Sequence, residues 1–124
     1  MAHLIHGLFV QKASVANTHL MFAGTIWRSP TPEIRTGQMQ DGWGLSTLSN
    51  IEFPAPPQTR FQFTKRYEGR PDDIYYSFDL RDGIWVGGYS GKDVGKGESW
   101  CVLTEVKDEL IFDPNYLEAL FKGK

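Results

Sequence analysis

The amino-acid sequence predicts one all-β domain, an antiparallel β-barrel or strongly curved sheet of roughly seven strands with a short C-terminal helix. Three observations predict it. The 124 residues suit a single domain spanning residues 1–124, because two separate cores of half that size would each be too small. Aromatic residues make up 14% of the chain, and large rings suit pleated surfaces and wide interiors. Short segments of alternating apolar and polar residues recur between turn residues, as expected for strands.

The clearest element is a hairpin formed by residues 73–81 and 84–91. The first segment alternates strictly, and Asp82-Gly83 follows it as a pair that readily takes the two positive φ angles of a tight hairpin turn. A two-residue turn fixes the register by subtraction. The opposed pairs on one face are Leu80 with Trp85, Phe78 with Gly87, Tyr76 with Tyr89, and Ile74 with Gly91.

A strand is expected on either side of this hairpin, which would complete a β-meander. Residues 59–67 place Phe61, Phe63, Lys65 and Tyr67 on one face. Residues 99–106 form the other strand, and the sequence does not decide which of its two faces points inward. The candidates for one side are Trp100, Val102 and Val106, and those for the other are Cys101 and Leu103.

The two ends of the chain are less regular. Residues 4–12 and 19–28 are expected to be strands, residues 43–53 one strand or two short pieces, and the polar residues 33–42 a loop. Asp113 is suited to capping a short C-terminal helix that begins at Pro114. This architecture resembles that of small lipocalin-like barrels. The resemblance concerns architecture alone and assigns no residue a role.

Composition excludes several classes of function. The formal net charge of −2 comes from interspersed acidic and basic residues, so no basic stripe exists to bind nucleic acid. No apolar run approaches the roughly 20 residues that span a bilayer. The apolar N-terminus lacks a basic leader, and Cys101 has no second cysteine to pair with. We therefore expect a cytoplasmic protein with no membrane partner and no cofactor.

Two sequence features suggest a phosphate-binding loop and a metal site, but neither has the residues that such a site requires. Residues 91–97 are rich in glycine and lysine, but Ser90 stands where a phosphate-binding loop needs glycine, and a strand follows instead of a helix. The three histidines are His3, His6 and His19. His3 and His6 have odd spacing on one strand and face opposite ways, so no metal site is expected.

Two polar residues are candidates for a ligand-binding role. Lys65 shares a face with phenylalanines, so strict alternation turns its ammonium group inward, where it needs an anion, water or a ligand group. A bulge or an extended side chain that reaches solvent would instead take it out of the interior. His6 lies between Leu4 and Leu8 on one strand face and would point inward, either as a ligand contact or as a hydrogen-bonded core residue.

The aromatic residues on the inner face support three hypotheses of function. In the first, the barrel binds a small apolar or aromatic molecule, with glycine at positions 87 and 91 leaving room for it. In the second, the same cavity serves a cofactor-independent enzyme of isomerase or lyase type. In the third, the rings fill the core, and exposed aromatics such as Tyr75 or Trp43 form an oligomer or partner surface. The expected ligand-binding residues are His6, Phe61, Phe63, Lys65, Tyr67, Tyr76, Phe78, Trp85 and Tyr89.

Overall fold

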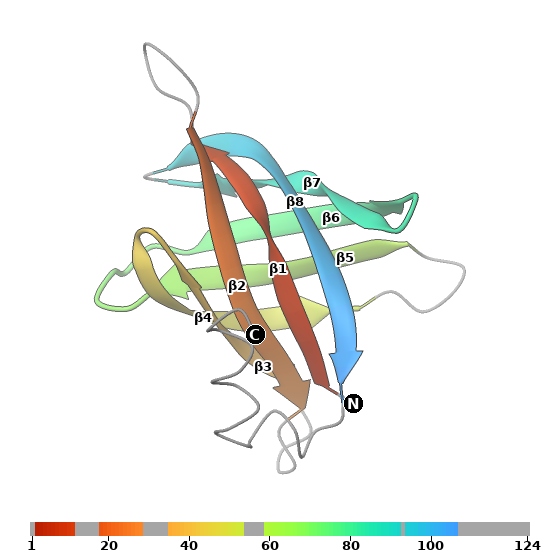
Figure 1. Ribbon diagram of the computed structural model, residues 1–124. Coiled ribbons are helices and arrows are strands. Elements are labelled where there is room, and N and C mark those ends of the chain that lie inside the picture. Colours follow the sequence, from red (N-terminus) through yellow and green to blue (C-terminus); the bar gives the residue numbers. More distant parts are fainter. Residues whose placement is uncertain (1, 12–17, 29–34, 54–58, 93, 107–124) are drawn as a thin grey trace.

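The protein is a closed antiparallel barrel of eight strands, as a computed structural model shows for residues 2–11, 18–28, 35–53, 59–92 and 94–106 (Figure 1). The strands are β1 (Ala2–Gln11), β2 (Thr18–Arg28), β3 (Arg35–Asp41), β4 (Gly44–Glu52), β5 (Arg60–Tyr67), β6 (Ile74–Arg81), β7 (Ile84–Gly91) and β8 (Gly95–Val106). The predicted all-β antiparallel barrel is confirmed, with eight strands instead of about seven. The expected C-terminal helix lies outside the described residues.

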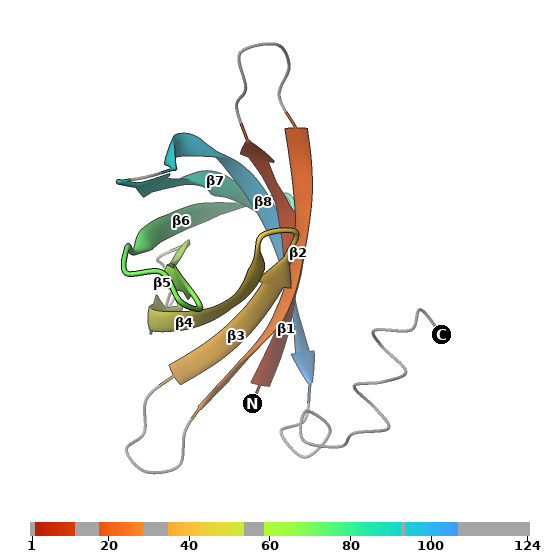
Figure 2. The ribbon, with the colours of Figure 1, turned by 90° about the vertical axis from the view of Figure 1, so that its left-hand side faces the viewer.

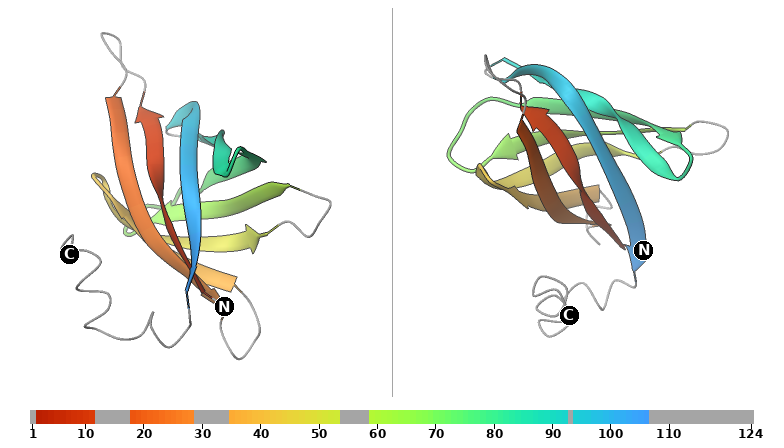
Figure 3. Two further views of the ribbon diagram at one scale, coloured as in Figure 1. Left: turned by 45° about the vertical axis from the view of Figure 1, so that its right-hand side comes forward. Right: turned by 45° about the horizontal axis from the view of Figure 1, so that its top comes forward.

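The first and last strands close the barrel. Each strand pairs with its neighbour in sequence, and β8 pairs with β1 from Ala2 opposite Val106 to Phe9 opposite Ser99. The two further views show β8 alongside β1 (Figure 3). Since every strand has two partners, the sheet presents no unpaired edge to another chain.

The hairpin of β6 and β7 has the register that the sequence predicts. Leu80 lies opposite Trp85, and Tyr76 lies opposite Tyr89. Asp82 and Gly83 have φ angles of 52° and 83°, as a turn with two left-handed residues requires. On the neighbouring strand β8, Cys101 lies opposite Trp85. Of the two possible inward faces of this strand, the structure therefore has the one with Cys101 and Leu103.

The prediction of a loop at residues 33–42 is wrong over the length of β3. This strand pairs with both β2 and β4, although its sequence RTGQMQD has one large apolar residue. Its inward-facing positions are Arg35, Gly37, Met39 and Asp41. Only one of these four is apolar and large, so the apolar alternation by which strands are recognised is absent.

Of the two alternatives for residues 43–53, the structure has one strand, β4, which a bulge interrupts. Leu48 and Ser46 face inward, while the register against β5 shifts between Ser49 and Glu52, where Asn50 has a φ of 49°. One extra residue moves the inward set from even to odd positions. Ile51 and Phe53 therefore pack against the core.

The middle of the barrel is filled by rings from neighbouring strands. Phe61 and Phe78 lie 5.8 Å apart between centroids, and Phe63 and Tyr76 lie 4.9 Å apart. These four side chains are at most 3% exposed. An eight-stranded barrel is just wide enough for side chains to fill it, and here they do.

The expectation that glycine at position 87 leaves room for a ligand is wrong. A Cβ atom there would overlap with the carbonyl oxygen of Ser77 and lie 2.7 Å from Cα of Phe78. Glycine therefore allows β7 to approach β6 closely at this point. At Gly91 the space is also occupied, by Val94 and Ile74 at 3.0 and 3.3 Å from the Cβ position.

The end of the barrel near the N-terminus is covered by a stack of side chains. His3 stacks on Phe53 with ring centroids 4.7 Å apart, and the guanidinium of Arg35 lies 4.5 Å from the centroid of the same ring. The Nε2 atom of His3 lies 3.8 Å from a carboxylate oxygen of Glu105. Burial lowers the pKa of His3 below its ordinary value of 6.5, while Glu105 acts in the opposite direction.

Gly87→Ala should destabilise the barrel, because its methyl group would push β7 away from β6. We expect a loss of about 1–3 kcal/mol in the free energy of unfolding, measured by chemical denaturation. Gly42→Ala is the matched control, since the nearest atom to its Cβ would be 3.8 Å away. Equal stability of the two variants would contradict the close approach of the strands.

The free energy of unfolding should fall as the pH drops below 6.5, in part because of His3. The unfolded chain takes up a proton on this imidazole near pH 6.5, whereas the folded chain takes it up only at lower pH. His3→Gln should therefore lose less stability than the wild type between about pH 7.5 and about 5.5. Denaturant titrations across this range measure the difference, and identical slopes would show that His3 is not protonated less readily in the folded state.

Candidate binding site at the turn end of the barrel

A pocket of about 330 Å³ opens at the end of the barrel that carries the β3–β4, β5–β6 and β7–β8 turns. We call this end the turn end, and Figure 2 shows the barrel from that side. The residues that line the pocket are Phe9, Gln11, Trp43, Tyr67, Arg70, Ile74, Tyr76, Tyr89, Val94 and Lys96. Five are aromatic, and only Gln11, Arg70 and Lys96 carry amide or cationic groups. An apolar wall with few polar groups is typical of small-molecule sites.

Lys65 lies within the barrel close to this pocket, as the alternation of β5 predicts. Its side chain is completely buried, so it neither bulges out nor reaches solvent. The ammonium donates to Oδ2 of Asp41 at 2.6 Å and lies 3.5 Å from the hydroxyl of Tyr76. The Asp41 side chain is also completely buried. The anion that Lys65 requires is therefore supplied by the chain itself.

Asp41 accepts hydrogen bonds on both carboxylate oxygens. Oδ2 accepts from Lys65 and from the hydroxyl of Tyr67 at 2.7 Å. Oδ1 accepts from the backbone N–H of Trp43 at 2.8 Å, which is the Asx-turn contact that aspartate favours in a tight turn. One carboxylate thus fixes the β3–β4 turn, which carries Trp43, and also contacts two residues of β5.

Aromatic rings surround the Lys65 ammonium on the sides that Asp41 does not occupy. Its Nζ atom lies 5.0 Å from the ring centroid of Phe9, 4.6 Å from that of Tyr67 and 5.4 Å from that of Tyr76. These distances fall within the range of cation–π attraction. All three rings also line the pocket, so the ion pair lies behind the aromatic wall.

Burial changes the titration of several of these groups. Burial lowers the pKa of Lys65, and the hydrogen bond and charge of Asp41 act against this lowering. The pKa values of Tyr67 and Tyr76 are both raised, first by burial and then by the nearby Asp41 carboxylate. Both phenols therefore stay protonated at neutral pH, and the Tyr67 hydroxyl acts as a hydrogen-bond donor.

Tyr89 forms the wall on the opposite side from β5. Its hydroxyl donates to the backbone carbonyl of Val10, and its ring is 5.6 Å from that of Tyr76. The ring covers the position where a Cβ atom of residue 97 would lie, so glycine is needed there. Tyr89 thereby connects β7, β8 and β1 at the turn end.

The structure divides the predicted site residues into three groups. Tyr67, Tyr76 and Tyr89 line the pocket, and Lys65 lies behind it. Phe61, Phe63, Phe78 and Trp85 pack in the barrel interior and do not line the pocket. The inward placement of His6 is wrong: it is exposed on the outside, because the inward residues of β1 are the odd-numbered ones such as Ile5 and Phe9.

Four residues of this site were not predicted to belong to it: Asp41, Phe9 and Arg70 had no predicted role, and Trp43 was expected on an exposed oligomer or partner surface. Asp41 lies in a segment that was expected to be a loop. Phe9 was not considered because the even-numbered residues of β1 were expected to face inward. The Asp41-Gly42-Trp43-Gly44 segment was a usable signal, since aspartate followed by glycine is typical of a hairpin turn. Arg70 lies in the connection between β5 and β6, where no alternation of residues predicts the direction of a side chain.

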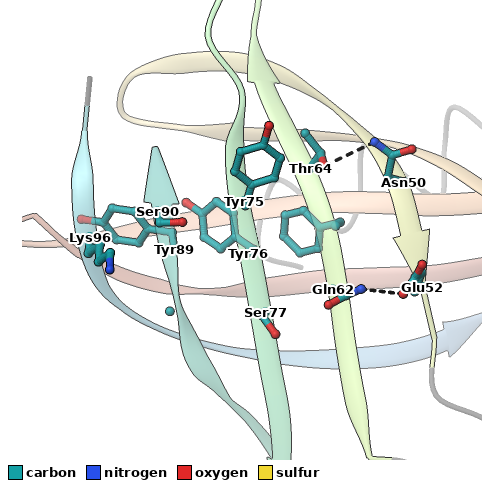
Figure 4. Close-up of a pocket in the computed structure, with 12 residues that line it drawn as sticks. Asn50, Glu52, Gln62, Thr64, Tyr75, Tyr76, Ser77, Tyr89, Ser90 and Lys96 are labelled. Carbon is teal, nitrogen blue, oxygen red and sulfur yellow. Dashed lines mark hydrogen bonds between the residues drawn. The ribbon is translucent and has the colours of Figure 1, made fainter. Parts of the chain in front are cut away.

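A second, larger hollow of about 540 Å³ lies on the outside of β4–β8 (Figure 4). Figure 4 shows two hydrogen-bonded pairs in this groove, Gln62 with Glu52 and Asn50 with Thr64, and Tyr75 lies next to Thr64. Seven of its twelve lining residues have non-aromatic polar or charged side chains, and four of these seven form the two bonded pairs. This outer groove is less suited to an apolar ligand than the pocket at the turn end.

The described residues contain neither a metal-type cluster nor a helix that fits a bilayer. No three histidine, cysteine, aspartate or glutamate side chains in this part of the chain come together to hold an ion. No helix there has the length and apolar character needed to cross a membrane. Comparisons of the chain with protein families, curated proteins and solved structures found no match.

Removing either member of the buried pair should destabilise the protein more than removing both charges. We expect Lys65→Met and Asp41→Asn each to cost about 3–5 kcal/mol, because each leaves the other charge buried without its partner. The double variant should lose less than either single variant, because no unpaired charge is left buried. An asparagine at position 41 can accept from the backbone N–H of Trp43 through its amide oxygen, while its NH2 group donates to the Tyr67 hydroxyl. Denaturant titration of all four proteins gives the coupling, and additive losses would contradict a direct interaction.

Proposed function

We propose that this protein binds a small, planar, apolar or aromatic molecule in the pocket at the turn end. The observation that supports this most is the wall of five aromatic side chains around about 330 Å³. Pockets of roughly 300–1,000 Å³ with apolar linings are typical of small-molecule sites. Rings on three neighbouring strands, as with Tyr67, Tyr76 and Tyr89, offer faces against which a flat molecule can stack.

The wall of the pocket is held in place before any ligand arrives. Tyr67 and Tyr89 both donate hydrogen bonds, to Asp41 and to the Val10 carbonyl. Trp43 follows a turn that Asp41 fixes through its other oxygen. A site that is ordered in advance loses less conformational entropy on binding, which favours affinity.

Passive binding fits this pocket better than catalysis by Lys65. A general acid or base must come within hydrogen-bonding distance of the reacting atom. The Lys65 ammonium is completely buried, paired with Asp41 and covered by the rings of Phe9, Tyr67 and Tyr76. The groups that a ligand would meet first are the aromatic faces, and the phenols among them are held protonated.

Trp43→Ala should weaken binding of an apolar probe, because it removes one wall of the pocket. The probe is N-phenyl-1-naphthylamine, a neutral molecule whose fluorescence rises in apolar surroundings. We expect saturable binding to the wild type and roughly tenfold weaker binding to the variant, in line with about 1–2 kcal/mol for a lost ring contact. Fluorescence titration measures both.

Tyr75→Ala is the matched control for this experiment. Tyr75 is 57% exposed, against 47% for Trp43, but it lines the outer groove and not the pocket. Its removal should leave the affinity unchanged. If it weakens binding instead, the outer groove is the site, and absence of saturable binding to the wild type would refute the proposal.

A further inference from the structure

Two cations stand at the open side of the pocket. Arg70 follows β5 in the β5–β6 connection, and Lys96 lies near the start of β8 on the opposite wall. Both side chains are exposed, and both line the pocket together with the aromatic residues. Lys96 also borders the outer groove, where Figure 4 shows it beside Tyr89.

Arg70 and Lys96 take no part in the ion pairs seen at His3, Arg60, Lys65 and Arg66. The Asp41 carboxylate behind the pocket wall is completely buried and paired with Lys65. Because Arg70 and Lys96 are both exposed, a ligand can reach their charged ends from solvent.

The local balance of charge remains positive when the neighbouring residues are included. A small hollow next to the pocket is lined by Arg70, Asp72, Asp73 and Lys92, among others. Among the residues that line the pocket and this hollow, Arg70, Lys92 and Lys96 are cationic and Asp72 and Asp73 are acidic. Asp73 is paired with Arg66 at 2.7 Å, so the charge around the opening is positive.

Arg70 lies over two rings of the pocket wall, so the edge of its guanidinium can still bind an anion. Its guanidinium carbon lies 5.4 Å from the ring centroid of Trp43 and 5.6 Å from that of Tyr67. A guanidinium that lies over rings keeps its planar fork of N–H donors for a carboxylate, which it binds with two parallel hydrogen bonds. The position of the anion site is thereby tied to the same two rings that form the apolar wall.

From this arrangement we infer that the ligand is amphiphilic: a planar aromatic body with one carboxylate or equivalent anionic group. The inference depends on the proposed function, since it concerns the same pocket. The body would stack on the rings within the pocket, and the anion would meet Arg70 and Lys96 at the opening. An anion placed there stays partly hydrated, which avoids the large cost of burying it in the barrel.

Two probes that differ by one anionic group test this inference. N-phenyl-1-naphthylamine is neutral, and 8-anilinonaphthalene-1-sulfonate has the same rings with a sulfonate added. We expect Arg70→Gln and Lys96→Gln each to weaken binding of the sulfonate about five- to tenfold, with affinity for the neutral probe unchanged within about twofold. Added salt should weaken binding of the sulfonate probe alone. Naphthalene-2-carboxylate should displace the sulfonate probe from the wild type.

The control variant is Arg81→Gln, which removes the same charge at the opposite end of the barrel beside the β6–β7 turn. It should bind both probes as the wild type does. An equal effect of Arg81→Gln and Arg70→Gln would show a general effect of net charge and overturn the inference.

Equal weakening of both probes by Arg70→Gln would overturn it too, since Arg70 would then act on the wall alone. Binding of the neutral probe without the sulfonate would overturn the inference and leave the proposed function intact, whereas failure of both would refute the proposed function.

Discussion

The buried pair of Lys65 and Asp41 determines how the turn end of the barrel is organised. Two charges removed from water are costly, and the cost is offset only where geometry is good and further hydrogen bonds are made. Asp41 meets both conditions, since it accepts from Lys65, from Tyr67 and from the backbone of Trp43. The same carboxylate therefore fixes a hairpin turn, a strand and two walls of the pocket. The shape of the pocket depends on this pair, although no ligand needs to touch it.

The aromatic interior explains why the hollow lies at one end of the barrel. In the middle, rings from β5 and β6 stack across the ladder, and β7 approaches so closely that position 87 has room for no side chain. At the turn end glycine serves a different purpose, because Gly44 and Gly95 have φ angles of 131° and 72°, which other residues rarely adopt. The chain thus uses glycine for close packing of strands in the middle and for the backbone conformation of two turns at the mouth.

The fold could be predicted from the sequence where alternation was strong, and the site only in part. The β6–β7 hairpin and the inward direction of Lys65 followed from strict alternation and one Asp-Gly turn. Strand β3 could not be recognised, since its pairing depends on β2 and β4 and only one of its own inward residues is apolar and large. The partner of Lys65 was therefore missed, because Asp41 comes close to it only through the closure of the barrel. The inward face of β1 was predicted wrongly because both of its faces carry apolar residues, such as Leu4 and Ile5.

The two ends of the barrel are built for different tasks. At the N-terminal end, His3 and Arg35 both lie against the ring of Phe53, and together they cover the core. At the turn end, Arg70 also lies over rings, yet those rings border open space. In both places a guanidinium over an aromatic face brings a cation to the rim without burying it. The difference lies in what fills the space beneath: Phe53 at one end, and a pocket at the other. Under the proposed function, a molecule would enter from the open end, apolar body first, so that any charged group it carries would remain beside the cations at the rim.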